Sequence, residues 1–272
     1  MSGEPILRAD DREAWSYWER VASVHASTRA FTRRVDGAKR LVERALVRGG
    51  RACVMWSAGK DSTCLAHLVV QEMGLRHVEL VSEKDDLDYP GEEAYVERLA
   101  AEWGAKLRIL RPDVSALGWV REHMVGHADE IHSRSAGLSK AVFYRLVDQA
   151  NREYAVVMMG LRAAERGPRK RVLESMGPVY EVQSGARVHA SPLAWWSGLD
   201  VLAYALTRGF ELLPVYRCIA LLHREAPWEV RKSWWLGGEG SRRHGHLAWL
   251  RHYWPSLYAE WVSWMPAVRV LT

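Results

Sequence analysis

The sequence predicts an α/β protein with a doubly wound, mostly parallel sheet, helices on both faces, and a Trp-rich, mainly helical C-terminal extension. Short apolar runs of strand length alternate with segments of helical periodicity over residues 51–208. Strands separated by helices at this spacing form βαβ units, whose crossovers are right-handed. Half of the 14 Trp residues lie between Trp228 and Trp264, which sets the C-terminal end apart.

The elements can be placed in chain order. Residues 11–49 carry apolar side chains at helical spacing, and Gly49-Gly50 ends this segment. Continuous apolar runs then predict buried strands, and the segments between them predict helices. The expected strands are residues 52–56, 77–82, 106–110 and 155–159, and the expected helices are residues 62–73, 92–103 and 139–152. A hairpin over residues 178–190 and a helix over residues 198–208 follow.

Length and composition limit the class of protein. The 272 residues are 48% hydrophobic and 26% charged, which is typical of a soluble globular chain. We expect an N-terminal helical segment at 1–50, an α/β domain at 51–222 and the Trp-rich extension at 223–272. The sequence has no stretch of about 18 uncharged apolar residues, so it predicts no membrane span. The N-terminus lacks the apolar core of a signal peptide. The three cysteines form no CxxC pair, so we expect a reducing cytoplasm.

Positive charge is concentrated in the C-terminal part of the chain. Residues 160–272 hold 15 Lys and Arg against 9 Asp and Glu, whereas residues 1–159 hold 23 against 24. An excess of six positive charges suggests an anionic partner such as a nucleotide, sulfate or nucleic acid. The alternative is an unevenly solvated surface with no such partner.

The segment Ser57-Ala58-Gly59-Lys60-Asp61-Ser62, between a predicted strand and a predicted helix, has the chemistry of an anion site. Small residues let backbone N–H groups approach a ligand, and the helix directs its N-terminal N–H groups to the same point. Lys60 adds a charge, and Ser57 and Ser62 add hydroxyl donors. It is not a Walker A loop, because Val54 stands where the first glycine would be.

Asp61 needs a separate explanation, because a carboxylate repels a bare phosphate. We expect Asp61 or Ser62 to cap the helix, or Asp61 to hold a magnesium ion. Ligands of open α/β sheets bind at the carboxyl ends of the strands, which is where this segment lies. The alternative is an ordinary turn between a strand and a helix.

The segment resembles the SxGKDS pyrophosphate loop of the adenine-nucleotide α-hydrolase-like (PP-loop) superfamily. Three further elements resemble the phosphoadenosine phosphosulfate (PAPS) reductase branch, which also includes the small subunit of ATP sulfurylase. They are Gly160-Leu161-Arg162 with Glu165 and Arg169, Ser191-Pro192-Leu193 with Trp196, Asp200 and Tyr204, and Leu213-Pro214-Val215-Tyr216. The resemblance covers residues 35–220 and implies ATP or PAPS as the ligand, with magnesium.

The resemblance also implies roles for individual residues. Lys60 and Arg162 would be catalytic, because they would neutralise charge on a leaving pyrophosphate, and Glu165 would orient Arg162. Lys140 and Arg169 would bind further anionic groups, and the loop 83–90 would lie near the adenine or ribose. The nucleotide would be bound by Ser57, Ala58, Gly59, Lys60, Asp61, Ser62, Gly160 and Arg162. No metal site other than magnesium near Asp61 is implied.

Departures from the family pattern limit the chemistry. Sulfonucleotide reductases carry a reactive cysteine near the C-terminus, but no cysteine follows Cys218, and residues 238–244 contain none. The paired cysteines that bind an iron–sulfur cluster in some reductases are also missing, so we expect no such cluster. A lone cysteine after an apolar run is more often buried and inert than reactive.

We therefore expect an enzyme of sulfur metabolism or base modification that cleaves ATP at the α-phosphate and releases pyrophosphate. One alternative is an enzyme that binds PAPS or its 5′-phosphosulfate analogue (APS) without the reductase cysteine. Another is a non-catalytic nucleotide sensor or nucleic-acid-binding module. The expected partners are an adenine nucleotide and an unidentified acceptor, with at most weak nucleic-acid binding through Arg242, Arg243 and Arg251.

Overall fold

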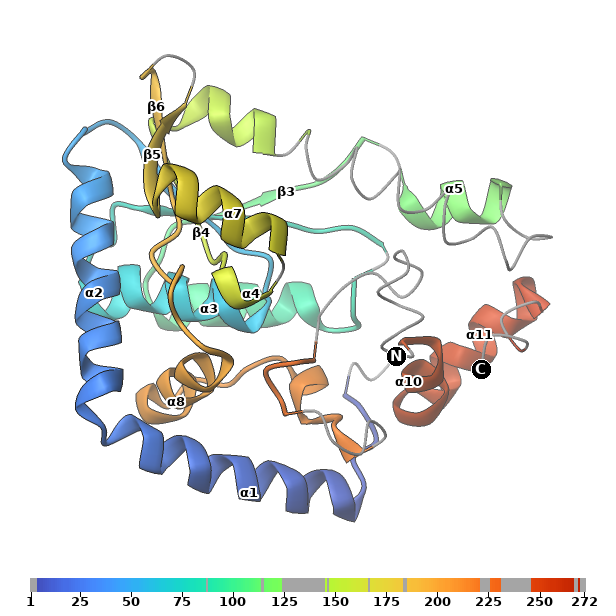
Figure 1. The fold of residues 1–272 in the computed structure, drawn as a ribbon. Coiled ribbons are helices and arrows are strands. Elements are labelled where there is room, and N and C mark those ends of the chain that lie inside the picture. The colour runs from blue at the N-terminus through green and yellow to red at the C-terminus, as the bar shows by residue number, and fades with distance from the viewer. Residues whose placement is uncertain are drawn as a thin grey trace.

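The computed structural model has one six-stranded sheet among its described residues (Figure 1). The structure describes residues 4–86, 88–113, 115–123, 145, 147–165, 167–182, 185–220, 226–230, 246–266 and 269. The strands are β1 (Ala52–Met55), β2 (Glu79–Glu83), β3 (Leu107–Leu110), β4 (Val156–Met159), β5 (Val179–Val182) and β6 (Arg187–Ala190). Their order in the sheet is β3-β2-β1-β4-β6-β5.

The sheet is parallel except at one edge. β1 pairs in parallel with β2 on one side and with β4 on the other, so that Cys53 lies between Glu79 and Val157. Only β5, the outer strand of the predicted hairpin, runs antiparallel to its neighbour β6. The strand order reverses at β1, and the crevice at such a reversal is where doubly wound sheets bind ligands. The expected mostly parallel, doubly wound sheet is confirmed.

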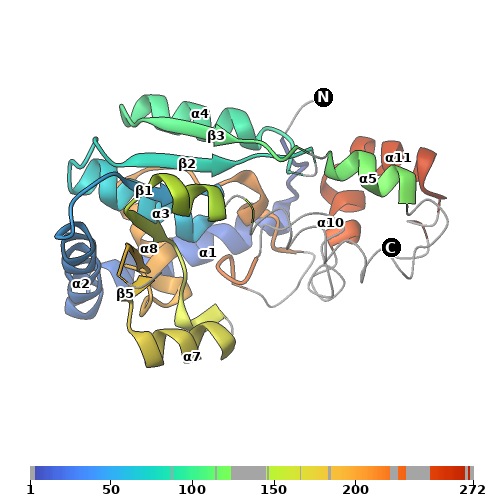
Figure 2. The same cartoon turned by 90° about the horizontal axis from the view of Figure 1, so that it is seen from above.

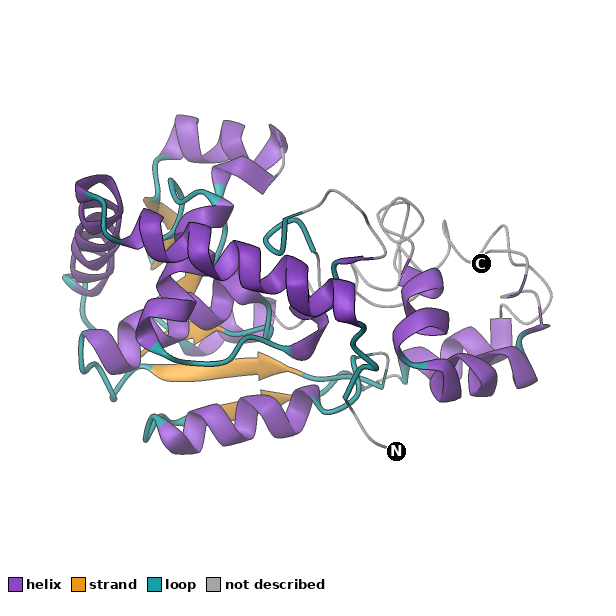
Figure 3. Cartoon of the chain, turned by 90° about the horizontal axis from the view of Figure 1, so that it is seen from below, coloured by secondary structure: helices purple, strands orange, loops and turns teal. Residues whose placement is uncertain are grey.

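Helices surround the strands (Figure 3). In the N-terminal part they are α1 (Ala9–Ala26), α2 (Arg29–Leu46), α3 (Lys60–His67) with a π-helical turn (Leu68–Glu72), α4 (Glu92–Glu102) and α5 (Ala116–His123). Then follow the 3-10 helix η2 (Ala163–Glu165), α7 (Gly167–Met176), α8 (Gly198–Arg208), the 3-10 helix η3 (Pro214–Arg217), α10 (His246–Tyr253) and α11 (Pro255–Trp264). None of the helices in the described part is long and apolar enough to cross a membrane.

Successive residues of β1 and β2 point to opposite faces of the sheet, and each face has its own hydrophobic core. Val54 and Leu80 face the larger core, which includes side chains from α1, α2, α3, α4 and α8. Cys53 and Val81 face a smaller core with Ala150, which lies on a helical stretch over residues 147–153. Helices therefore cover both faces of the sheet, because each face presents an apolar layer that must be kept from water.

Two helical expectations need correction. The helical segment predicted over residues 11–49 is broken, because Thr28 caps α2 by accepting a hydrogen bond from the Phe31 N–H at 3.2 Å. The helices α5 and α7 were not expected, although the Gly167-Pro168 sequence at the start of α7 suits a helix N-terminus. The first part of the predicted helix 139–152 lies outside the described residues.

Both ends of the chain are joined to the α/β region through one buried carboxylate. Asp11 on α1 accepts hydrogen bonds from the N–H groups of Ile219 (3.0 Å) and Ala220 (2.8 Å) and from the Tyr253 hydroxyl (2.7 Å). The larger core accordingly includes described residues before 51 and after 222. The predicted division at residues 50 and 222 stays a prediction, but side chains on either side of both boundaries pack together.

The C-terminal helices lie at the carboxyl end of the sheet. Figure 2 shows β2 pointing toward the side of the molecule where α5, α10 and α11 lie. The Tyr89 ring in the loop after β2 contacts Trp254, with 5.6 Å between centroids, and the Arg121 guanidinium lies 5.0 Å from the Trp264 ring centroid. The Trp-rich extension is therefore next to the edge of the sheet where ligands of this architecture bind.

Candidate functional site

The loop between β1 and α3 makes a sharp turn. Ala58 is fully buried and has a left-handed backbone, with φ at 56°, which is uncommon for a residue with a side chain. Gly59 follows in an extended conformation as the N-cap of α3 and offers no capping side chain. The expectation that Asp61 or Ser62 caps this helix is therefore wrong. The helix begins earlier, at Lys60, and the Ser62 hydroxyl donates to the Gly59 carbonyl at 3.0 Å.

The start of α3 brings backbone donors and hydroxyl groups together. The N–H groups of a first helical turn have no partner within the helix, so they can bind an anion. Tyr216 of η3 takes one of them, because its hydroxyl accepts from the Lys60 N–H at 2.9 Å. The Ser57 and Ser62 hydroxyl oxygens are 3.2 Å apart. Tyr216 was not among the predicted site residues, although it stands in the last family-like element of the sequence.

Three buried charges meet beside this turn. The Asp61 carboxylate accepts from Lys60 Nζ at 3.0 Å and from Arg162 Nε at 2.5 Å. Burial alone would raise the pKa of Asp61, but the charges and hydrogen bonds of Lys60 and Arg162 outweigh it and hold this pKa below its ordinary value. Asp61 is therefore an anion that links two cations, which sequence reasoning did not foresee.

Gly160 explains how the end of β4 reaches this cluster. A Cβ atom on Gly160 would lie 2.7 Å from the Ser62 backbone nitrogen and 2.8 Å from the Asp61 carbonyl carbon. Only glycine lets the two backbones approach so closely. Arg162, two residues further on, then extends its guanidinium to Asp61. The structure thus brings together the predicted residues 57–62, Gly160 and Arg162.

A chain of charged side chains leads from the buried cluster to the surface. Arg162 Nη2 lies 3.8 Å from Glu165 Oε1, and Glu165 also pairs with Arg169, whose side chain is 41% exposed. Arg162 is thus inside the site and Arg169 at its rim. Three cations against two carboxylates leave this group of five with a net charge of +1. Lys140, the other predicted anion-binding residue, lies outside the described residues.

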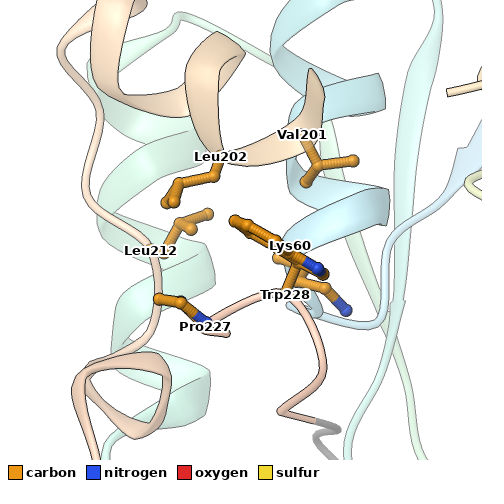
Figure 4. A pocket seen from close by; sticks show the side chains of 6 residues that line it. All are labelled: Lys60, Val201, Leu202, Leu212, Pro227 and Trp228. Carbon is orange, nitrogen blue, oxygen red and sulfur yellow. The ribbon is translucent and has the colours of Figure 1, made fainter. Parts of the chain in front are cut away.

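Part of the C-terminal extension closes the site. The Val230 carbonyl accepts from Lys60 Nζ at 3.5 Å. Figure 4 shows the Lys60 side chain among the residues that line a small pocket. Its other lining residues are Val201, Leu202, Leu212, Pro227 and Trp228. Sequence reasoning missed Trp228 and Val230, because nothing in their local pattern relates them to the loop.

The donor set near Asp61 does not fit a metal held by the protein. Both Asp61 oxygens already accept from cations. No group of three or more His, Cys, Asp or Glu side chains suited to a metal occurs in the part of the chain that the structure describes. In the acidic loop after β2, the buried Lys84 pairs with Glu92 and lies 3.8 Å from Asp88. We therefore derive no step through a metal at these residues.

None of the three thiols is available at the surface. Cys53, Cys64 and Cys218 are free and buried. Burial raises the pKa of Cys218 well above its ordinary range, and its thiol donates to the Pro214 carbonyl at 3.7 Å. A neutral, enclosed thiol is a poor nucleophile.

The phosphoadenosine phosphosulfate reductase domain family matches residues 51–218. The chain belongs to this family. The matched range includes the loop, Gly160, Arg162, Arg169 and Tyr216, and it ends before Trp228 and Val230. No curated protein matches the sequence. The family assignment confirms the resemblance derived from the motifs.

The solved structures to which this chain is similar are distant from it in sequence. The PAPS reductase of Candida auris, in a phosphate complex, is 15% identical, with 70% of this chain and 86% of that chain covered and a TM-score of 0.49. The FMN adenylyltransferase of Candida glabrata is 14% identical, with 78% and 69% covered and a TM-score of 0.47. The same adenylyltransferase in complex with ATP is 14% identical, with 78% and 68% covered and a TM-score of 0.46.

Proposed function

We propose that this PAPS reductase family member binds ATP at the loop 57–62 and cleaves it at the α-phosphate. A nucleophile of the acceptor attacks the α-phosphorus, and the bond to the bridging oxygen breaks. Pyrophosphate leaves with the bonding electrons, the acceptor becomes adenylated, and its proton passes to water. The buried cluster of Lys60, Asp61 and Arg162 beside the N-terminus of α3 carries this proposal.

The cluster suits a leaving group that gains charge. Two cations share one carboxylate, so phosphate oxygens can replace Asp61 as their partner. The first turn of α3 adds N–H donors and the positive end of a helix dipole. Because these groups are held in place before the reaction, they stabilise developing negative charge with little reorganisation. Lys60 and Arg162 are thus the residues to which we assign catalysis, and the fixed geometry positions the reacting phosphate.

Other residues have supporting roles in this proposal. Ser57 and Ser62 offer hydroxyl donors, and Gly160 permits the close contact on which the position of Arg162 depends. Arg169, at the rim, is placed to meet an anionic group of the nucleotide or acceptor. Magnesium would accompany ATP as its counter-ion, and we assign none of the described residues to hold it. The buried, unpaired cysteines support a reducing compartment such as the cytoplasm.

A second candidate is a PAPS- or APS-binding enzyme that lacks the reductase cysteine. Family membership favours it, and the same cations would bind the sulfate or phosphate of such a nucleotide. The burial of Cys218 supports the view that this chain supplies no thiol to the substrate. A third candidate, a non-catalytic nucleotide-binding module, differs from both in releasing no product.

One pair of measurements separates these candidates. ATP and PAPS are each titrated against the protein by calorimetry, with and without magnesium, and pyrophosphate release from ATP is measured with candidate acceptors. We expect ATP to bind and pyrophosphate to appear with the correct acceptor. Binding of PAPS alone would favour the second candidate. Binding without product across sulfate, nucleic acid and carboxylate acceptors would favour the third.

A further inference from the structure

Residues 226–230, here called the cover segment, lie directly over the catalytic lysine. The Val230 carbonyl accepts from Lys60 Nζ at 3.5 Å, and Asp61 accepts from the same nitrogen at 3.0 Å. The Lys60 side chain is only 5% exposed, and Val230 is fully buried. The ammonium group on which the proposed function depends is therefore enclosed by residues that follow the family-matched range.

Trp228 keeps the cover segment in place. Its ring packs edge-on against Trp18 of α1, with 4.6 Å between centroids. It also lies on the backbone of Gly198, where an added Cβ would come within 2.1 Å of Trp228 Cδ1. The indole and the Lys60 side chain line the same narrow pocket (Figure 4). The position of Trp228 thus depends on a glycine at the first residue of α8.

The Lys60 ammonium group is enclosed while these contacts persist. The ammonium group donates to the Asp61 carboxylate at 3.0 Å and to the Val230 carbonyl at 3.5 Å, and Trp228 and Pro227 line the pocket beside its side chain. A phosphate that binds Lys60 Nζ from the side of the cover segment therefore has to displace the Val230 carbonyl. A phosphate oxygen can compensate for the loss, because a charge-assisted hydrogen bond is stronger than one to a neutral carbonyl.

We propose that the cover segment is a displaceable cover on the phosphate loop, which bound nucleotide phosphates remove from Lys60. This inference rests on the proposed nucleotide function. A protein whose binding-competent state is only partly populated has an apparent affinity reduced by that fraction. Loosening the cover segment therefore tightens nucleotide binding, which is the opposite of what damage to a binding site does.

Two variants loosen the cover segment without changing the loop. Gly198→Ala adds a methyl group where the Trp228 ring lies, and alanine suits the helical backbone at this position. Trp228→Ala removes the ring itself. The controls are Gly37→Ala, where the added Cβ would be 3.9 Å from its nearest neighbour, Arg40, and Trp264→Ala in α11.

The experiment measures exposure of Lys60 and nucleotide affinity separately. Each variant is treated briefly with an amine-acylating reagent, and modification of Lys60 is quantified by peptide mass spectrometry. ATP and PAPS are then titrated by calorimetry. We expect faster modification of Lys60 and about 3- to 10-fold tighter nucleotide binding in Gly198→Ala and Trp228→Ala, with both controls like the unmodified chain.

The outcomes separate the two proposals. Unchanged modification and unchanged or weaker binding in a folded Gly198→Ala variant would overturn the cover, even where the unmodified chain binds nucleotide. Faster modification of Lys60 with no nucleotide bound by any variant would uphold a displaceable cover and refute the nucleotide function. Should Trp228→Ala fail to fold, Gly198→Ala still decides.

Discussion

Replacement of Lys60 by methionine tests the assignment of the phosphate site. Methionine keeps an unbranched side chain in the narrow pocket beside Trp228 but removes the charge. Asp61 keeps its hydrogen bond from Arg162 Nε at 2.5 Å, so the buried carboxylate remains paired and the fold should persist. The change removes one charge-assisted contact to phosphate, which contributes about 1.5–3 kcal/mol. We expect affinity for the preferred nucleotide to fall about 10- to 150-fold.

Calorimetric titration of ATP and of PAPS measures this loss, and thermal unfolding shows whether the fold is kept. Lys170→Met is the matched control, since this lysine lies on α7 with a 58% exposed side chain that pairs with Glu174. The control should bind as the unmodified chain does. Equal affinity of Lys60→Met and the unmodified chain for both nucleotides would refute the reasoning, because the cluster around Asp61 would then have no part in binding.

Four further outcomes are expected. Gly160→Ala places a methyl group 2.7 Å from the Ser62 nitrogen, so it should destabilise the fold by about 1–3 kcal/mol and weaken nucleotide binding. Denaturation measures the loss of stability, and calorimetry measures the loss of affinity. Unchanged stability and unchanged affinity would show that the close contact between Gly160 and Ser62 is not needed. Burial lowers the pKa of His67 from 6.5 to about 4. As the pH falls from 6.5 to 4, His67 therefore becomes protonated in the unfolded chain but stays neutral in the folded chain. Stability should therefore be complete above pH 6.5 and fall by up to about 3 kcal/mol toward pH 4, and urea unfolding of His67→Gln should show a shallower decline; parallel pH profiles would contradict this. With thioredoxin as reductant, the protein should release no sulfite from PAPS or APS, since Cys218 is buried, whereas sulfite production lost in Cys218→Ser would oppose that view. Gel shifts with tRNA and single-stranded DNA should show only weak binding, and tight binding with a steep salt dependence would point instead to a nucleic-acid-modifying enzyme.

The order of the elements could be read from the sequence because it depends on local patterns. The apolar run at 52–56 is strand-like in length and is followed by the small residues Ser57, Ala58 and Gly59. Such a pattern predicts a strand, a turn and a helix whatever lies elsewhere in the chain. The anion-site chemistry of residues 57–62 followed for the same reason. Family resemblance then added Gly160 and Arg162, and the structure places both at the loop.

The partners within the site were decided by the tertiary structure. Asp61 is not a helix cap, because α3 begins before it, at Lys60, and its carboxylate instead pairs with Lys60 and with Arg162, which is 101 residues away. Tyr216 and Val230 reach Lys60 across 156 and 170 residues. No periodicity or spacing encodes such contacts, since they exist only when the sheet brings the carboxyl ends of its strands to one edge and the C-terminal extension packs over that edge. The sequence by itself predicted an anion site at residues 57–62, whereas the packing of distant segments decided which groups contact Lys60 in the structure.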